Sequence, residues 1–156
     1  MTLTGFDKRG YSFSLFDGLS DDQTARMLHY METQRFFSGD VLIVEGAIDR
    51  TLYIVTRGEV NVVAEDIHTG APCLLVTRQA GTPFGEMAFF DKLPRSASIL
   101  AATDGELLQL RWEQFQRMRD AEPDLALALV MELGRKVSVT VRQEMSRNAE
   151  RSSPKD

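Results

Sequence analysis

A short segment in the middle of the chain, residues 81–98, combines residue types that could bind an anion. We expect Glu86–Phe90 to form a short helix that begins directly after Gly85. The first backbone N–H groups of a helix have no partner within it, and they form the positive end of the helix dipole. An anion is therefore favoured at this position. Because Gly85 has no Cβ atom, a ligand could also approach its backbone closely.

Arg95 is the second residue that could bind an anion, nine positions after Glu86. After Pro94 the chain must return as a strand, and this return could bring the Arg95 guanidinium back to the same helix end. A planar guanidinium donates two parallel hydrogen bonds, which suit two oxygens of a phosphate. Ser96 adds a hydroxyl donor beside it, and the small side chain of Ala97 leaves room for its N–H to face a ligand.

Glu86 has a different chemistry, because an ionised carboxylate only accepts hydrogen bonds. It would contact a sugar hydroxyl or an arginine rather than a phosphate. A ligand with a phosphate at one end and a ribose hydroxyl at the other would satisfy both Arg95 and Glu86. The alternative is that Glu86 and Arg95 pair with each other and close the loop without a ligand. These residues alone leave both interpretations open.

Short runs rich in β-forming residues lie on both sides of this segment. Glycines separate the first runs, and we expect Gly39, Gly46 and Gly58 to occupy turns with positive φ. About seven or eight short strands at such regular spacing are typical of a β-sandwich or jelly roll. Together with flanking helices they predict an α+β protein. The clearest runs are 41–44, 52–55, 60–63, 73–77, 96–101 and 106–110.

Helices are predicted at both ends of the strand region. Ser20 and Gln23 have the spacing of a capping box, so we expect a helix over about 21–32. Apolar spacing predicts a short helix at 112–120, whose Trp112, Phe115 and Met118 we expect in the core. Pro123 suits the first turn of a longer helix, with an apolar stripe that could serve as core or as a dimer seam. The stripe consists of Leu125, Leu129, Leu133, Val137 and Val141.

The length of 156 residues and the hydrophobic content of 43% indicate one domain with a proper core. We place this domain at residues 13–146. Residues 1–12 are expected to be a leader, and the polar residues 147–156 a disordered tail. The one cysteine of the chain, Cys73, is expected to be a small buried apolar residue.

Composition disfavours several classes of function. The net charge of −5 opposes non-specific binding of nucleic acid. The chain has one cysteine and therefore no thiolate cluster. Its two histidines, His29 and His68, are too far apart in the sequence to suggest a metal site, and we expect both at the surface. No apolar run reaches the ~18–20 residues of a membrane span, and the N-terminus does not resemble a signal peptide. We therefore expect a cytoplasmic protein that holds no metal and is not an enzyme.

Residues 84–88 (Phe-Gly-Glu-Met-Ala) and 94–98 (Pro-Arg-Ser-Ala-Ser) resemble the phosphate-binding cassette of the cyclic nucleotide-binding domain family. This family includes catabolite activator proteins, regulatory subunits of cyclic-AMP-dependent kinase and cyclic-nucleotide-gated channels. The glycines expected at turns also match its framework, and the resemblance covers about residues 13–140. It implies an antiparallel, jelly-roll-like β-roll with an N-terminal helix, a short cassette helix and long C-terminal helices.

The resemblance also implies a role for each cassette residue. The arginine pairs with the cyclic phosphate, and the glutamate binds the ribose 2′-hydroxyl. The residue after the arginine, here Ser96, influences the choice of base, and with Ser96 cyclic AMP is slightly favoured over cyclic GMP. The purine would be capped from the C-terminal helix by Arg135 or Lys136. The implied phosphate residues are Arg95, Ser96 and Ala97, and the implied ribose residues are Gly85, Glu86 and Met87.

The family binds cyclic nucleotides without transforming them, so the resemblance implies a regulatory sensor without a cofactor. Ligand binding would fold the C-terminal helix over the base and change a surface offered to an effector protein, or to a second copy through the 125–141 helix. Residues 147–156 leave no room for a DNA-recognition helix, so we expect a stand-alone sensor that binds no nucleic acid. The alternative is a ligand-free protein-interaction or dimerisation module on the same fold.

Overall fold

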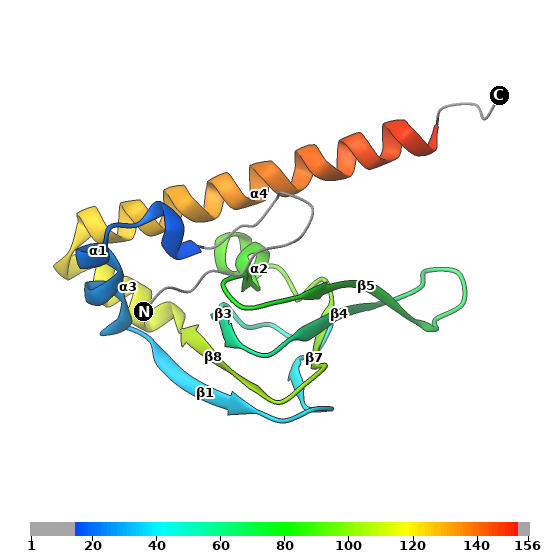
Figure 1. Cartoon of the computed structure of the whole chain (residues 1–156), viewed down its shortest axis with the longest axis horizontal. Coiled ribbons are helices and arrows are strands. Elements are labelled where there is room, and N and C mark those ends of the chain that lie inside the picture. The colour runs from blue at the N-terminus through cyan, green and yellow to red at the C-terminus, as the bar shows by residue number, and fades with distance from the viewer. Residues whose placement is uncertain (1–14, 153–156) are drawn as a thin grey trace.

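The protein is an antiparallel β-roll with helices at both ends, in a computed structural model that describes residues 15–152 (Figure 1). This arrangement confirms the predicted α+β class and the β-roll. The expected leader, residues 1–12, lies outside the described residues, and so do residues 153–156 of the expected tail.

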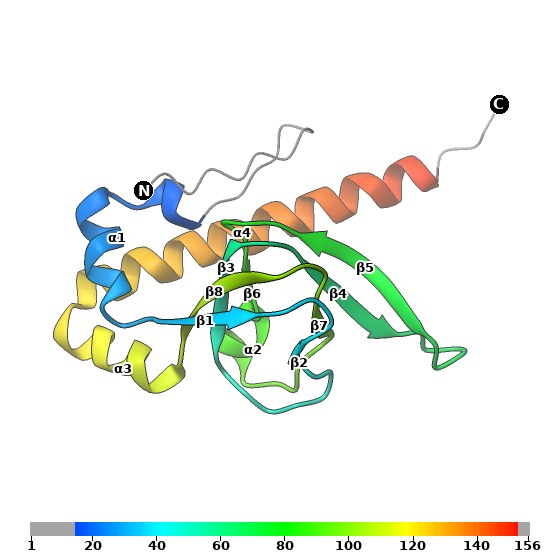
Figure 2. The ribbon, with the colours of Figure 1, turned by 60° about the horizontal axis from the view of Figure 1, so that its bottom comes forward.

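The strands of the described residues form two four-stranded sheets, in which all neighbouring strands are antiparallel. Their order is β1–β8–β3–β6 in the first sheet and β2–β7–β4–β5 in the second. In Figure 2 the β4–β5 hairpin extends beyond the rest of the roll. The strands are β1 (Glu32–Phe36), β2 (Val41–Ile43), β3 (Leu52–Arg57), β4 (Val60–Glu65), β5 (Pro72–Arg78), β6 (Pro83–Phe84), β7 (Ser98–Ala101) and β8 (Gly105–Leu110).

The side chains between the two sheets form one of two hydrophobic cores. Val55 of β3, Val60 of β4 and Leu107 of β8 are completely buried in it. Phe36 of β1 and Ile99 of β7 complete it from the outer strands. Since successive side chains of a strand point to opposite faces, the same strands can contribute to a second core on the other face of the first sheet.

The helices cover that other face, and their apolar side chains form the second core with Leu52, Leu108 and Leu110 from β3 and β8. Phe115 and Met118 are buried here as predicted, with Trp112 partly buried against them. The helices are η1 (Leu15–Gly18), α1 (Asp21–Leu28), α2 (Glu86–Asp91), α3 (Trp112–Ala121) and α4 (Pro123–Arg151).

The capping box predicted for α1 is present. The Ser20 hydroxyl accepts a hydrogen bond from the Gln23 N–H (3.1 Å), and the Gln23 side-chain oxygen accepts one from the Ser20 N–H (2.9 Å). The prediction that this helix reaches residue 32 is wrong, because α1 ends at Leu28 and residues 32–36 pair with β8. The backbone groups of residues 32–36 are thus satisfied in the sheet rather than in a helix.

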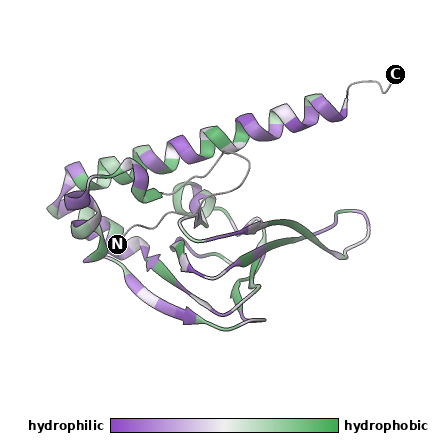
Figure 3. Ribbon diagram, viewed as in Figure 1, coloured by the Kyte–Doolittle hydropathy of each residue, from purple (hydrophilic) through white to green (hydrophobic). Residues whose placement is uncertain are grey.

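Two further expectations are corrected at the edges of the fold. The helix α4 continues to Arg151, so residues 147–151 are helical rather than the start of a disordered tail. Cys73 is exposed rather than buried, and it lies on β5, an edge strand of its sheet whose side chains are mostly exposed. Figure 3 shows the hydrophobic residues of β4 and β5 along this hairpin, and Leu74 and Leu75 are exposed on it.

Other local predictions are confirmed. Gly39, Gly46 and Gly58 have φ angles of 90°, 84° and 87°, a region that favours glycine. His29 and His68 are both exposed.

The apolar stripe predicted on the C-terminal helix is only partly buried. Leu125, Leu129 and Leu133 are fully buried in the second core, whereas Val141 is 52% exposed. Among the described residues of α4, none after Lys136 is buried. The first part of α4 therefore belongs to the core, and the rest extends past the other helices over the β-roll (Figure 1).

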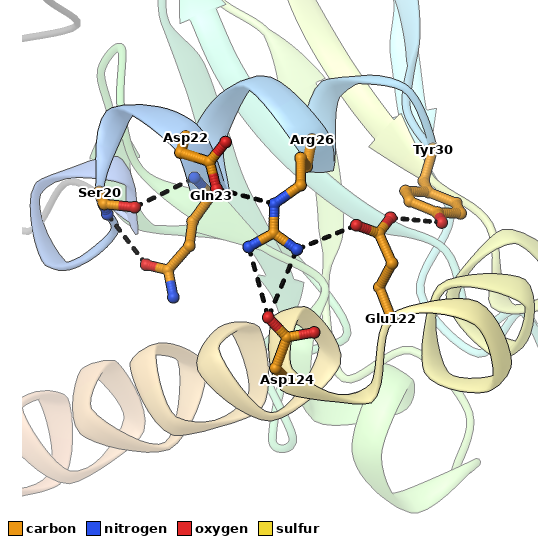
Figure 4. A network of polar contacts seen from close by, with 7 residues as sticks. All are labelled: Ser20, Asp22, Gln23, Arg26, Tyr30, Glu122 and Asp124. Carbon is orange, nitrogen blue, oxygen red and sulfur yellow. Dashed lines mark hydrogen bonds and ion pairs between the residues drawn. The ribbon is translucent and has the colours of Figure 1, made fainter.

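A polar network fixes the junction between α3 and α4 (Figure 4). Glu122 is the one residue between these helices. Its carboxylate accepts hydrogen bonds from Arg26 (2.9 Å) and from the Tyr30 hydroxyl (2.6 Å). Arg26 also pairs with Asp22 in α1 and with Asp124 in the first turn of α4. The N-terminal helix is thereby joined to the start of the long helix.

This network predicts an acid-dependent contribution to stability. Hydrogen bonds from Tyr30 and Arg26 hold the pKa of Glu122 below its ordinary value. The stabilisation is therefore present above the ordinary carboxyl pKa of about 4.3 and is lost as the pH falls through the lowered pKa. We expect Glu122→Gln to lower the urea midpoint at neutral pH, with a difference from the wild type that narrows below about pH 4.

Urea titrations of both proteins across this pH range would check the prediction. Glu150→Gln removes an exposed carboxylate from the end of the same helix and should leave the urea midpoint nearly unchanged. A deficit of Glu122→Gln that stays constant with pH would contradict a role for the ionised carboxylate.

Candidate functional site

A cavity of about 350 Å³ lies beside α2, between the strands of the roll and α4. Its volume falls in the range of small-molecule sites, about 300–1,000 Å³. The cassette residues predicted from the sequence all line it: Gly85, Glu86, Met87, Arg95, Ser96 and Ala97. Much of the remaining wall is apolar and comes from strands: Ile43, Val62, Leu75, Val76, Phe84 and Ile99.

Arg95 is the most buried charged residue of this cavity, with 4% of its surface exposed. Its Nη1 donates to the Gly85 carbonyl (3.0 Å), and its Nη2 donates to the Asp49 carboxylate (2.9 Å) and the Thr51 carbonyl (2.8 Å). The Arg95 backbone N–H also donates to the Ala47 carbonyl (2.8 Å). The loop between β2 and β3 therefore holds both the backbone and the side chain of this arginine.

One nitrogen of the Arg95 guanidinium, Nε, is buried and has no hydrogen-bond partner among the described residues. A buried donor without a partner costs about 1–3 kcal/mol, and such donors are rare in native proteins. An anionic oxygen in the cavity would satisfy this donor with a charge-assisted hydrogen bond. Arg95 thus retains capacity for a ligand although its other nitrogens are engaged.

Gly85 allows the arginine to lie this close to the start of α2. Its φ of 79° lies in the left-handed region. A Cβ atom at this position would lie 2.6 Å from Arg95 Nη1. Both the backbone conformation and the close contact therefore require glycine.

Asp49 and Thr51 are site residues that the sequence analysis missed. Burial alone would raise the pKa of Asp49, but hydrogen bonds from Arg95 and Thr51 outweigh burial and hold this pKa below its ordinary value. Asp49 is therefore ionised at neutral pH and neutralises Arg95. No local pattern connects the two residues, because they lie 46 positions apart in the chain.

Glu86 pairs with Lys136 rather than with Arg95. The Lys136 ammonium donates to Glu86 Oε1 (2.6 Å) and to the Pro83 carbonyl (3.0 Å). Lys136 is 6% exposed, and this burial lowers its pKa, while the attraction of Glu86 offsets part of the effect. The alternative in which Glu86 and Arg95 close the loop as one ion pair is wrong, since each charge has a separate partner.

The two cations predicted on the C-terminal helix differ in position. Lys136 lines the cavity, whereas the Arg135 side chain is 53% exposed and pairs with Glu132 (2.9 Å). Adjacent residues of an α-helix point about 100° apart, so the two side chains leave α4 in different directions. Thr140, one helical turn after Lys136, also lines the cavity. The sequence analysis missed Thr140, although its spacing of four from Lys136 places the two on one helix face.

Arg78 of β5 is a third cation in the lining, and the sequence analysis missed it too. It is half-buried, and burial lowers its pKa while Glu86 offsets part of the shift. An arginine remains protonated even so. Arg78, Arg95 and Lys136 outnumber the carboxylates of Glu86 in the lining and of Asp49 behind Arg95 by one charge. The electrostatics of the cavity therefore favour an anion.

Comparison with known proteins agrees with this geometry. The family model described as "Cyclic nucleotide-binding domain" matches residues 33–122, more than half of the chain. The chain belongs to the cyclic nucleotide-binding domain family. Glu86 and Arg95 of this cyclic nucleotide-binding domain lie within the matched residues.

Several relatives resemble this cyclic nucleotide-binding domain. Human cGMP-dependent protein kinase 2 is 33% identical over 90 residues, which are 58% of this chain and 12% of the kinase. The cyclic AMP receptor protein of Thermus thermophilus is 30% identical over 123 residues, 79% of this chain and 56% of that protein. The chain thus spans 12% to 56% of the length of these two proteins.

A solved structure shows the same fold. The crystal structure of a cyclic nucleotide-binding domain from Methylobacillus flagellatus KT has a TM-score of 0.79 and 23% identity to this chain. The match covers 88% of this chain and 76% of the other. Within residues 15–152 no group of three or more His, Cys, Asp or Glu side chains could hold a metal ion. None of the helices in that range is long and apolar enough to cross a membrane.

Replacing Asp49 tests how far the cyclic nucleotide-binding domain depends on the neutralisation of Arg95. Asp49→Asn keeps the side-chain shape but leaves the buried guanidinium without its counter-charge. We expect the free energy of unfolding of the ligand-free protein to fall by about 1–3 kcal/mol, measured by urea unfolding. As the control, Asp120→Asn removes an exposed carboxylate next to Arg119. This variant should change the free energy of unfolding by less than about 0.5 kcal/mol. Equal effects of the two variants would argue against Asp49 as the counter-charge.

Proposed function

We propose that this domain binds a purine cyclic nucleotide in the cassette cavity and acts as a regulatory sensor, with cyclic AMP slightly favoured over cyclic GMP. The buried Arg95, with its Nε unpaired, is the observation that carries this proposal. The cavity volume of about 350 Å³ suits one mononucleotide. The excess of positive charge in the lining suits a single phosphate.

The cavity offers a separate environment to each part of such a ligand. The phosphate would meet Arg95 together with Ser96 and the backbone of Ala97. The ribose hydroxyl would meet the Glu86 carboxylate, which Lys136 holds in place. The purine would lie against the apolar strand residues of the wall, in the direction of Thr140.

The choice of base depends on few polar groups. Ser96 supports both cyclic AMP and cyclic GMP. Arg135 would have to leave Glu132 to cap the base, and Lys136 is engaged by Glu86 and Pro83. Thr140 therefore joins these two residues as a candidate contact of the purine.

The long helix is the element that would carry the signal. Its first part is held by the core and by the network of Arg26, Glu122 and Asp124. Lys136 is its last buried described residue and is bonded to the glutamate that would meet the ribose. A ligand hydroxyl that donates to Glu86 would compete with the hydrogen bond from Lys136 to this carboxylate. A weaker bond to Lys136 would favour another position of the outer part of α4. Such a shift requires different ligand affinities for the two positions.

Isothermal titration calorimetry with cyclic AMP and then cyclic GMP tests the proposal directly. Any copurified nucleotide would first be removed and identified. We expect micromolar or tighter binding of at least one nucleotide, and the ratio of the two dissociation constants measures the base preference. Absence of heat with both, on a folded and nucleotide-free sample, would favour a ligand-free interaction module instead.

Arg95→Ala should remove most of the affinity. Loss of this arginine leaves the phosphate without its charged partner, at a cost of about 2–5 kcal/mol. The dissociation constant should rise about 30-fold to several-thousand-fold, as measured by the same calorimetry. If the alanine variant is unstable, Arg95→Lys replaces it in the same measurement. Its dissociation constant should also rise, because an ammonium supplies charge without the planar fork. Arg35→Ala, at an exposed arginine of β1, is the matched control. Wild-type affinity in Arg95→Ala would contradict the assignment.

A second copy of the chain is the partner that α4 supports best. The predicted seam at 125–141 is mostly core, since Leu125, Leu129 and Leu133 are buried. The outward side of α4 instead exposes Leu127, Met131, Val141 and Met145. Together with Gly134 and Ser138 these positions alternate in steps of four and three, the period of a coiled coil. We therefore propose that a homodimer forms through this outward face.

Met131→Glu should weaken such a dimer strongly. A symmetric dimer places the residue in the seam twice, so two charges would be buried, and the dissociation constant should rise more than about 100-fold. Analytical ultracentrifugation over a concentration series measures this constant. Ser146→Glu adds the same charge outside the seam and should have little effect. A wild-type protein that remains monomeric at high concentration would contradict the dimer.

A further inference from the structure

Arg50 joins the end of the cassette helix to the start of α3. Its Nε and Nη2 both donate to the Phe89 carbonyl, at 3.2 and 2.8 Å. The centre of its guanidinium lies 3.3 Å from the ring centroid of Trp112, the first residue of α3. A guanidinium over a tryptophan ring is attracted by the ring electrons, and a carbonyl in the last turn of a helix lacks a helical partner. One side chain therefore contacts residues at the end of α2 and at the start of α3.

Phe89 provides a second connection between the same two helices. Its side chain is 1% exposed in the second core. Its ring packs edge-on against the rings of Trp112 and Phe115, with centroids 5.3 and 5.1 Å apart. A displacement of Phe89 would therefore be felt by α3 through packing as well as through Arg50, because protein interiors are close-packed.

The two residues next to Arg50 in the chain both hold Arg95, the arginine proposed to bind the phosphate. Asp49 accepts a hydrogen bond from Arg95, and the Thr51 carbonyl accepts another. In three consecutive residues the outer two contact Arg95, and the middle one contacts Phe89 and Trp112. Arg50 does not line the cavity.

We propose that Arg50 is the positioning residue that transmits phosphate binding at Arg95 to α3 and, through α3, to the long helix. This inference rests on the proposed function. A phosphate that engages Arg95 Nε redistributes the hydrogen bonds that Arg95 shares with residues 49 and 51. The backbone of Arg50 lies between those residues, so its guanidinium moves relative to Phe89 and Trp112. The helix α3 packs directly on α4, with Glu122 alone between them.

The inference requires both functions of the guanidinium. A lysine could either stack on Trp112 or donate to the Phe89 carbonyl, but its compact ammonium lacks the planar fork that does both. A methionine has a similar apolar stem and neither function. Arg50→Met and Arg50→Lys therefore form a graded pair, and Arg35→Met removes an exposed arginine charge far from the cassette as the control.

Two readouts follow the signal in each variant. Trp112 is the single tryptophan of the chain, so its emission reports directly on the start of α3. Spin labels on the native Cys73 of β5 and on a cysteine introduced by Glu150→Cys report the position of the outer part of α4, and both sites are exposed. Dilution with unlabelled protein restricts the measurement to distances within one copy. Calorimetry with cyclic AMP gives the affinity of each variant.

In the wild type and in Arg35→Met, saturating cyclic AMP should change both the Trp112 emission and the label distance. Arg50→Met should bind cyclic AMP within about fivefold of the wild type, the lower end of typical coupling factors. Its ligand-induced change in label distance should fall to less than about half, with Arg50→Lys intermediate.

Three results would overturn the inference. A full change of label distance in Arg50→Met would show that the signal bypasses this residue. A loss of affinity as large as that of Arg95→Ala would show that Arg50 serves binding rather than transmission. Failure of the wild type to bind either cyclic nucleotide would refute the proposed function itself, and this result is distinct from the first two. If Arg50→Met does not fold, the same comparisons apply to Arg50→Lys.

Discussion

The burial of the Arg95 guanidinium is the constraint on which the rest of the site depends. A cation with 4% exposure needs a counter-charge and hydrogen-bond acceptors. The fold supplies them from two directions, with Asp49 and Thr51 on one side and the Gly85 carbonyl on the other. These contacts fix the loop between β2 and β3 against the cassette. They also leave Nε as the one buried side-chain donor without a partner among the described residues.

The second charge pair of the cavity links a different set of elements. Glu86 begins the cassette helix, and Lys136 lies in the middle of α4, so their bond ties the cassette to the long helix. The two pairs neutralise charge separately, which keeps the glutamate and the arginine at distinct parts of the cavity. The lining therefore presents a guanidinium and a carboxylate at different places.

Local features could be predicted from the sequence because they depend on local physics. The capping box of Ser20 and Gln23 and the turn glycines need only neighbouring residues. The resemblance to the family could be recognised for the same reason, since both parts of the motif lie within residues 84–98. Strand β1 was missed because its residues, Glu-Thr-Gln-Arg-Phe, are mostly exposed and show no apolar alternation. Strand β6 was missed because it has only two residues.

The long-range partners could not be predicted. Asp49 becomes a site residue only when its loop folds onto Arg95, and no local pattern encodes that contact. The difference between Arg135 and Lys136 depends on the rotation of α4 about its axis, which packing against the second core decides. The exposure of Cys73 depends on a hairpin that extends beyond the roll. In each case the side-chain chemistry was visible in the sequence, and the missing information was three-dimensional.

The bond between Lys136 and Glu86 has a consequence for how strictly the cavity would distinguish ribose from deoxyribose. A carboxylate that faced the sugar alone would lose its donor when the 2′-hydroxyl is absent, and a buried acceptor left without a donor costs about 1–3 kcal/mol. Here Lys136 already donates to the same carboxylate at 2.6 Å. A 2′-deoxy analogue would therefore leave Glu86 partly satisfied, and the discrimination against it would be weaker than an isolated glutamate would impose.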